Sequence, residues 1–145
     1  MRLVDANLLV YAFARAMPQH ARCRTWLDAR LNDEVPLGLP WPSLVAFVRL
    51  VTNPRVFPQP VAVPVAWRQV EEWLACPPVW IPQPTERHAE LLGRLLAGSG
   101  MRATLVQDAH LAALALEHGL AVASADADFA RFQGLRWENP LAGAP

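Results

Sequence analysis

The sequence predicts an α/β fold in which a small parallel sheet is flanked by helices. Short apolar segments of strand length alternate along the chain with longer segments whose apolar residues recur at helical spacing. No Asn-Gly dipeptide offers a tight turn between two strands, so we expect parallel strands joined by right-handed crossovers. The chain has 145 residues, which suits one domain, and we expect a single domain over residues 1–145.

The first half of the chain alternates between strands and helices at clear breakpoints. Residues 3–4 form a short apolar strand that leads into a helix over residues 7–16, and Pro18 separates this helix from the next. Pro42 and Ser43 are good opening residues for a helix that follows the second strand. The predicted elements here are strands at 3–4 and 37–39 and helices at 7–16, 19–31 and 43–51.

The second half begins with a proline-rich loop. Prolines at positions 58, 60 and 64 predict a loop over residues 57–64, and Thr85 is a suitable cap for the helix that ends near Gly98. The helix 104–118 has little polar face and is predicted to be the most buried. The predicted elements are helices at 65–75, 85–98 and 104–118, strands at 79–81, 120–124 and 135–137, and a short turn or helix at 126–132.

Four aspartates stand where apolar segments end. Asp5 follows the first strand, and Asp126 and Asp128 follow the fourth. Asp108 lies near the start of the most apolar helix. Charged side chains are rarely buried without a partner, and sites in open parallel sheets form beyond the carboxyl ends of the strands. We therefore expect the four carboxylates to meet at one edge of the sheet.

Converging carboxylates require a cation. Two like charges about 4 Å apart repel by about 4 kcal/mol at an effective dielectric constant of 20, so they cannot all stay ionised without neutralisation. A donor set of oxygen atoms, with no His or Cys nearby, suits Mg²⁺ or Mn²⁺. Such ions orient a phosphodiester and activate water, so the sequence predicts metal-dependent hydrolysis of a phosphate-bearing substrate.

Each aspartate also has a plain structural interpretation. Asp5 alone could cap the first helix, and Asp126 and Asp128 could be ordinary turn residues. Asp108 is harder to explain in this way, although an ion pair with Arg102 would account for it.

Other polar residues near these acids have two interpretations. Asn7 and Ser124 are either donors that support the carboxylates or ordinary cap and strand-end residues. His20 and His88 are predicted to be solvated helix residues, and His118 is predicted to interact with the dipole of its own helix.

The composition excludes several mechanisms and indicates where in the cell the protein is expected. The net charge is zero, so no global basic field recruits nucleic acid, and the absence of lysine excludes a P-loop lysine or a Schiff base. Cys23 and Cys76 do not make a zinc site or a disulfide framework. The segment 1–5 lacks the longer apolar core of a signal peptide and no apolar run approaches a membrane span, so we expect a cytoplasmic protein without membrane contact.

Three segments carry the acids and their neighbours in a defined order. They are Leu3-Val4-Asp5-Ala6-Asn7-Leu8-Leu9, Asp108-Ala109-His110-Leu111-Ala112-Ala113-Leu114-Ala115 and Ser124-Ala125-Asp126-Ala127-Asp128-Phe129. Each segment alone is a weak signal. Their order and spacing in a chain of this size resemble a PIN-domain ribonuclease of the VapC toxin type, and the resemblance extends over nearly the whole chain.

The resemblance implies a PIN-like three-layer fold and Mg²⁺- or Mn²⁺-dependent endonucleolytic cleavage of RNA, with tRNA or another structured RNA as substrate. It also implies a homodimer and a cognate VapB-type antitoxin whose carboxy-terminal segment covers the acidic site. Asn7 and Ser124 match supporting positions of the family. By position, the acids that match metal-binding residues, directly or through water, are Asp5, Asp108, Asp126 and Asp128.

One position departs from the family pattern. Many members have a glutamate in the helix after the second strand, and Ala46 stands at about that place here. Asp128 could compensate for the lost acid. The alternative is a catalytically weakened PIN domain that acts as an RNA- or partner-binding module.

Overall fold

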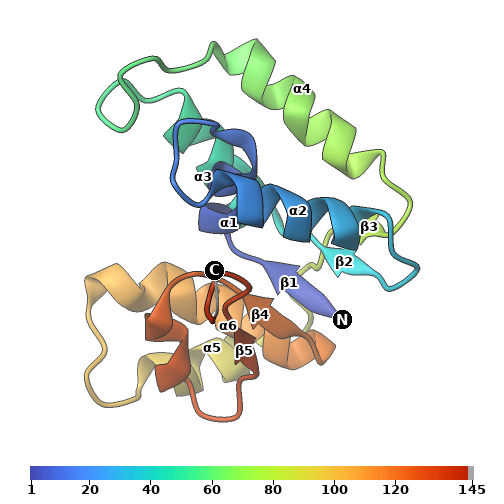
Figure 1. The fold of residues 1–145 in the computed structure, drawn as a ribbon. Coiled ribbons are helices and arrows are strands. Elements are labelled where there is room, and N and C mark those ends of the chain that lie inside the picture. The colour runs from blue at the N-terminus through green and yellow to red at the C-terminus, as the bar shows by residue number, and fades with distance from the viewer. Residues whose placement is uncertain (144–145) are drawn as a thin grey trace.

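A five-stranded parallel sheet runs through the middle of the computed structural model, which describes residues 1–143 (Figure 1). The strand order is β3-β2-β1-β4-β5, and each neighbouring pair is parallel. The strands are β1 (Arg2–Val4), β2 (Leu37–Gly38), β3 (Val79–Trp80), β4 (Ala121–Ala123) and β5 (Trp137–Glu138). The predicted small parallel sheet is confirmed.

Helices cover both faces of this sheet. Figure 1 shows α1 to α4 on one side and α5 with α6 on the other, so the protein has three layers. The helices are α1 (Ala6–Phe13), α2 (His20–Leu31), α3 (Trp41–Val51), α4 (Val63–Leu74), α5 (His88–Leu96) and α6 (Val106–His118), with 3₁₀ turns η1 (Ala103–Leu105) and η2 (Ala127–Arg131).

Two hydrophobic cores lie on the two faces, and successive strand residues divide between them. Val4 packs into the core beneath α1, α2 and α3, whereas its neighbour Leu3 packs into the core beneath α6. Val122 and Ala123 of β4 divide in the same way. The strands are therefore buried on both faces, which explains why they appear in the sequence as continuous apolar runs.

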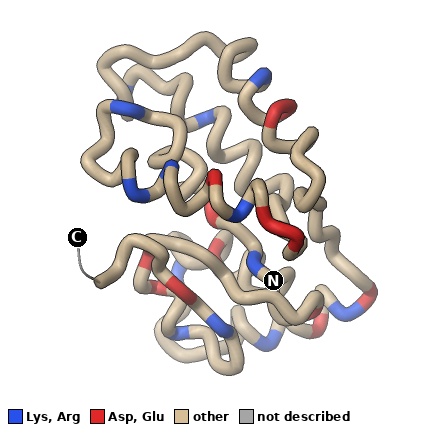
Figure 2. Tube along the Cα trace, turned by 45° about the vertical axis from the view of Figure 1, so that its right-hand side comes forward, with Lys and Arg blue, Asp and Glu red and all other residues tan. Residues whose placement is uncertain are grey.

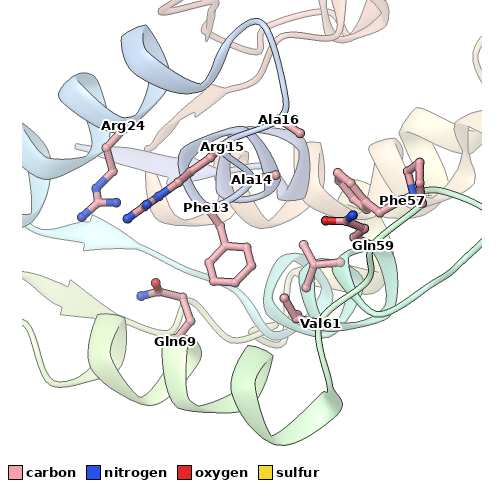
Figure 3. Close-up of a pocket in the computed structure, with 11 residues that line it drawn as sticks. Phe13, Ala14, Arg15, Ala16, Arg24, Phe57, Gln59, Val61 and Gln69 are labelled. Atoms are coloured by element: carbon pink, nitrogen blue, oxygen red, sulfur yellow. The ribbon is translucent and has the colours of Figure 1, made fainter.

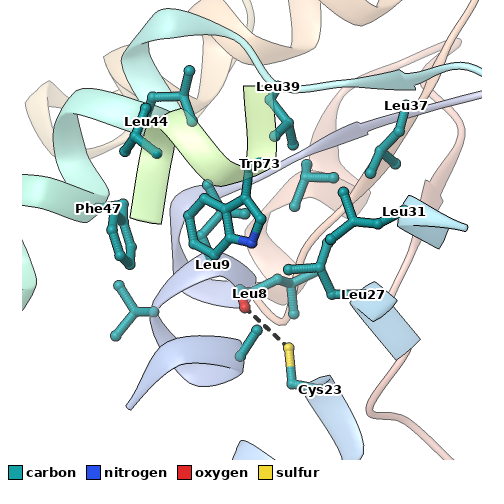
Figure 4. Close-up of a cluster of buried hydrophobic side chains, with 14 of the residues drawn as sticks. Leu8, Leu9, Cys23, Leu27, Leu31, Leu37, Leu39, Leu44, Phe47 and Trp73 are labelled. Carbon is teal, nitrogen blue, oxygen red and sulfur yellow. Dashed lines mark hydrogen bonds between the residues drawn. The ribbon is translucent and has the colours of Figure 1, made fainter. Parts of the chain in front are cut away.

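The larger core ties the first two helices together. Figure 4 shows Leu8 and Leu9 of α1 among side chains from α2, α3 and the sheet. The Cys23 thiol donates to the Leu8 carbonyl oxygen at 3.0 Å, so this buried cysteine has a hydrogen-bond partner in the core. The position of α1 directly after β1 is fixed by these contacts.

The chain reverses its direction across the sheet at the centre. It runs from β1 outward through β2 to β3, and then returns to place β4 on the other side of β1. The gap between the carboxyl ends of β1 and β4 is therefore the topological switch point, where open α/β sheets bind their ligands.

Several element boundaries differ from those predicted. Helix α4 begins at Val63, inside the predicted loop, because proline is tolerated in the first turn of a helix and Pro64 occupies that turn. Helix α5 begins at His88, three residues after the predicted cap Thr85. The Thr85 hydroxyl instead accepts from the Arg87 amide and closes a turn that precedes the helix. Within the described residues, no helix combines the length and apolarity needed to cross a bilayer.

The end of α6 generates a stability prediction. Gly119 closes this helix with φ +68°, a left-handed conformation that an L side chain adopts at a cost of about 1–2 kcal/mol. Gly93 lies inside α5 with open space around its Cβ position, where alanine gains about 0.5–1 kcal/mol over glycine. In urea unfolding, Gly119→Ala should lower the free energy of unfolding and Gly93→Ala should raise it. Shifts of the same sign would contradict this assignment.

Candidate active site

The carboxyl ends of β1 and β4 lie side by side at the switch point. Val4 is paired with Ala123, and the Asp5 amide donates to the Ala123 carbonyl oxygen at 3.0 Å. Each strand is followed by a polar residue, Asp5 after β1 and Ser124 after β4. The pairing places these two residues beside each other.

The Ser124 hydroxyl joins three segments. It donates to Asp5 Oδ2 at 2.7 Å, and it accepts from Asn7 Nδ2 at 3.1 Å and from the Asp126 amide at 3.0 Å. One donor and two acceptor sites are all that a hydroxyl has, so this buried group is fully used. Ser124 thereby fixes Asp5 relative to the segment that carries Asp126.

Asn7 strengthens the same junction from α1. Its side-chain oxygen accepts from the Ala125 amide at 3.3 Å while its nitrogen donates to Ser124. Asn7 therefore bridges the first turn of α1 and the chain after β4. Asn7 and Ser124 thus join the two strand ends, and their role in supporting the carboxylates of a metal site stays a prediction.

Three carboxylates come together at this edge. Asp108, Asp126 and Asp128 each offer an oxygen atom, and these atoms all lie within 4.8 Å of one another. Asp108 comes from the first turn of α6, while Asp126 caps η2 by accepting from the Asp128 amide at 2.9 Å. The donor set contains oxygen only, which suits a hard divalent cation.

Asp5 stands beside this group of three and is not a member of it. Its Oδ1 accepts from the Ala6 amide at 2.7 Å, and its Oδ2 accepts from Ser124. Asp5 is thus both the N-cap of α1 and a neighbour of the acidic group. Its role as the N-cap of α1 therefore does not remove it from the neighbourhood of the acids, which its charge reaches.

The electrostatics of the site favour added positive charge. Burial, and after it the charges of Asp5, Asp126 and Asp128, raise the pKa of Asp108 to about 6, while Arg131 opposes the shift. Burial also raises the pKa of Asp5, against the hydrogen bonds from Ser124 and Ala6. Both raised pKa values mean that ionising these carboxylates in the folded protein costs free energy, and a bound cation would offset that cost.

The ion-pair interpretation of Asp108 finds no support in the described residues. Arg102 instead donates from Nε to the Thr104 hydroxyl at 3.2 Å. The basic side chain beside the acids is Arg131, whose Nη2 lies 3.7 Å from Asp128 Oδ1. The sequence offered one signal for it, since Arg131 lies three residues after Asp128.

A network of histidines was also missed. His88 contacts the carboxylate of Glu117 through Nδ1 and His110 Nδ1 through Nε2 at 3.0 Å. The prediction that His88 is solvated is wrong, since only 13% of its side chain is exposed. His118 donates from Nε2 to the Gln83 carbonyl oxygen at 2.7 Å, outside its own helix. These contacts fasten the start of α5 to α6.

A pocket of about 620 Å³ lies elsewhere in the molecule (Figure 3). The residues that line it include Phe13, Phe57, Arg15 and Arg24. None of the four aspartates lines it. This pocket and the acidic group are therefore separate features, and the chemistry argued above belongs to the acids.

Comparison with known sequences identifies similar proteins over nearly the whole chain. Residues 2–135 match the family described as PIN domain. Ribonuclease VapC37 of Mycobacterium tuberculosis is 46% identical over 142 residues, which cover 98% of this chain and 99% of that protein. Ribonuclease VapC43 of the same species is 43% identical over 143 residues, which cover 99% of this chain and 97% of that protein.

Solved structures show the same fold at low sequence identity. VapBC2 from Rickettsia felis, bound to a DNA fragment from its promoter, matches with a TM-score of 0.70 at 15% identity, over 95% of this chain and 97% of that chain. VapC20 of Mycobacterium tuberculosis, titled a Sarcin-Ricin loop cleaving toxin, matches with a TM-score of 0.67 at 16% identity, over 94% of this chain and 99% of that chain.

The raised pKa of Asp108 generates a pH prediction. Because its pKa is about 6 in the folded protein and 3.8 for the ordinary group, ionisation of Asp108 destabilises the fold above about pH 6. This penalty shrinks as the pH falls from about 6 and is gone below about 4. In EDTA, Asp108→Asn should therefore raise the free energy of unfolding at pH 8 and leave it nearly unchanged at pH 4. An equal effect at both pH values would contradict the assignment.

Proposed function

This chain belongs to the PIN-domain family and to its VapC-type ribonucleases, and on that premise we propose that it is the toxin of a toxin–antitoxin pair that hydrolyses RNA phosphodiester bonds with a divalent cation. We propose further that residues 1–145 form a single PIN domain and that the substrate is tRNA or another structured RNA. A cytoplasmic location is part of the proposal and is supported by two free cysteines.

The observation that carries the proposal is the group formed by Asp108, Asp126 and Asp128. Their oxygen atoms lie within 4.8 Å of one another at a sheet switch point, which supports the proposal that they share one cation. The donor chemistry and the raised pKa of Asp108 both fit Mg²⁺ or Mn²⁺. When bound there, such an ion supplies an orienting charge for the phosphodiester and an activated water.

The chain's own residues hold the carboxylates in place. Ser124 holds Asp5 against the segment after β4 through a hydrogen bond. The turn η2 carries Asp128 near its start and Arg131 at its end. Asp5 is near enough to raise the pKa of Asp108, so we propose that it completes the acidic site. Because these contacts are formed before substrate arrives, the site is organised in advance of the reaction.

RNA binding does not require a basic protein. The net charge is zero, and Figure 2 shows arginine positions in both halves of the molecule. A small number of arginines near the acids is enough to hold a phosphate backbone locally. We propose that the RNA contacts are confined to the neighbourhood of the acidic edge.

A VapB-type antitoxin is the proposed protein partner. The similar structures include complexes titled VapBC2 from Rickettsia felis and FitAB bound to a DNA fragment, each at 20% identity or less. The likeness of fold together with the VapC relatives supports an antitoxin that covers the acidic edge of this chain.

We also propose a homodimer, and this generates a prediction. Trp41 and Trp67 stack with ring centroids 6.3 Å apart and are 36% and 42% exposed, which is unusual for large aromatic rings. In sedimentation equilibrium the protein should have twice the monomer mass of 16.0 kDa, and Trp67→Ser should shift it toward the monomer. Val65→Ser, about 200° away around α4, is the matched control and should leave the dimer intact. A monomeric wild-type protein would contradict the proposal.

Cleavage of total RNA with tRNA resolved tests the enzymatic proposal. The purified protein should give discrete products with Mg²⁺ or Mn²⁺ and none with EDTA. Asp108→Asn should lower the rate by more than about 100-fold, the upper range for a residue that only supports a ligand. Asp28→Asn should cleave normally, because Asp28 is an exposed residue paired with Arg24 on α2.

The opposite result would favour the binding module. Ala46 is half-buried on α3 where many family members carry a further acid, so a weakened site is the specific alternative. No cleavage in either metal by a folded protein free of antitoxin would support it. Equal cleavage by the wild type and Asp108→Asn would instead point to a contaminating nuclease.

A further inference from the structure

Arg131 is placed between the acidic site and the loop that precedes α6. It ends η2, with Nη2 at 3.7 Å from Asp128 Oδ1 and Nη1 donating to the Gly100 carbonyl oxygen at 3.5 Å. Among the described arginines, Arg131 is the one whose charge opposes the raised pKa of Asp108. Its guanidinium is therefore part of the electrostatic environment of the acids.

Both contacts of Arg131 are long. A separation of 3.7 Å exceeds hydrogen-bond length, and 30% of the Arg131 side chain and 42% of the Asp128 side chain are exposed. Exposed ion pairs of this kind contribute little to stability. The guanidinium can therefore exchange its present partners for a stronger one at small cost.

A phosphate group is a stronger partner than Asp128. Arginine presents a planar fork of donors that matches two phosphate oxygens, and such charge-assisted pairs are shorter and stronger than long contacts to a carboxylate. A cation held by the carboxylates would also weaken the attraction of Asp128 for Arg131, because it neutralises the same charge. The acidic edge would otherwise repel the RNA backbone.

We propose that Arg131 is a phosphate-binding residue of the acidic site, which releases Asp128 and holds an RNA phosphate beside the carboxylates. The proposal rests on the proposed ribonuclease function, since it names the group that positions the substrate. It also gives a role to the guanidinium of Arg131, the positively charged group that lies beside these acids among the described side chains. A structural role in η2 alone is the competing explanation.

Salt dependence of RNA binding separates the two explanations. The probe is a fluorescently labelled single-stranded RNA of mixed sequence, with Ca²⁺ in place of Mg²⁺ to prevent cleavage. Each phosphate contact to a single strand contributes about 0.7 to the slope of log affinity against log salt concentration. Arg131→Gln keeps a donor for the Gly100 carbonyl oxygen and removes the charge, so its slope should be smaller by about 0.7.

Two further variants complete the test. Arg131→Lys keeps the charge and should keep the wild-type slope while losing part of the affinity, because it lacks the planar fork. Arg94→Gln is the matched control, an exposed arginine that pairs with Glu90 on α5, and it should leave the slope unchanged. Thermal unfolding and Mn²⁺ titration of each variant show whether the fold and the acidic site are intact.

An unchanged slope in Arg131→Gln would overturn the proposal. A loss of stability or of Mn²⁺ affinity with no change in slope would assign Arg131 a structural role and would overturn it as well. Failure of the ribonuclease proposal has a different signature, which is absence of cleavage by the wild type. An Arg131-dependent slope in a protein that does not cleave would retain the phosphate contact and remove only the enzymatic assignment.

Discussion

The pairing of β1 with β4 is the constraint on which the site depends. Val4 opposite Ala123 brings the next two residues, Asp5 and Ser124, side by side from opposite ends of the sequence. A shift of one residue in this register would turn every side chain of β4 to the other face and separate the Ser124 hydroxyl from Asp5. The two cores hold the register, because Leu3 and Val4 must enter different cores. The geometry of the candidate site and the packing of the core therefore depend on the same pairing.

The sequence was informative where local chemistry decides the outcome. The parallel sheet, the order of strands and helices, and the placement of acids at strand ends follow from apolar patterns and proline positions. Asp5 was ambiguous because one carboxylate serves as a helix cap and as a neighbour of the acids, and sequence patterns do not separate the two uses. The start of α4 was misplaced because proline was interpreted as a loop residue, although it fits the first turn of a helix.

Long-range contacts explain what the sequence could not predict. His88 appeared solvated because its partner Glu117 lies 29 residues away, and helical periodicity places neither residue against the other. The three bonds of Ser124 likewise join residues separated by up to 119 positions. Arg131 was one arginine among 13, and its position three residues after Asp128 was the only signal that set it apart. A side chain's partners become known only when the sheet order is known, since that order decides which distant segments touch.

The same strand pairing has a consequence for the order of events during synthesis. The central strand is made first, but its neighbour β4 and the acids that follow it come from residues 121–128, near the end of the chain. A chain still being translated therefore has Asp5 and Asn7 in place without Asp108, Asp126 or Asp128 to accompany them. Contacts between distant parts of a chain also form late in folding. The acidic group of Asp108, Asp126 and Asp128 therefore forms only after residue 128 has been synthesised, long after the strand beside which it lies.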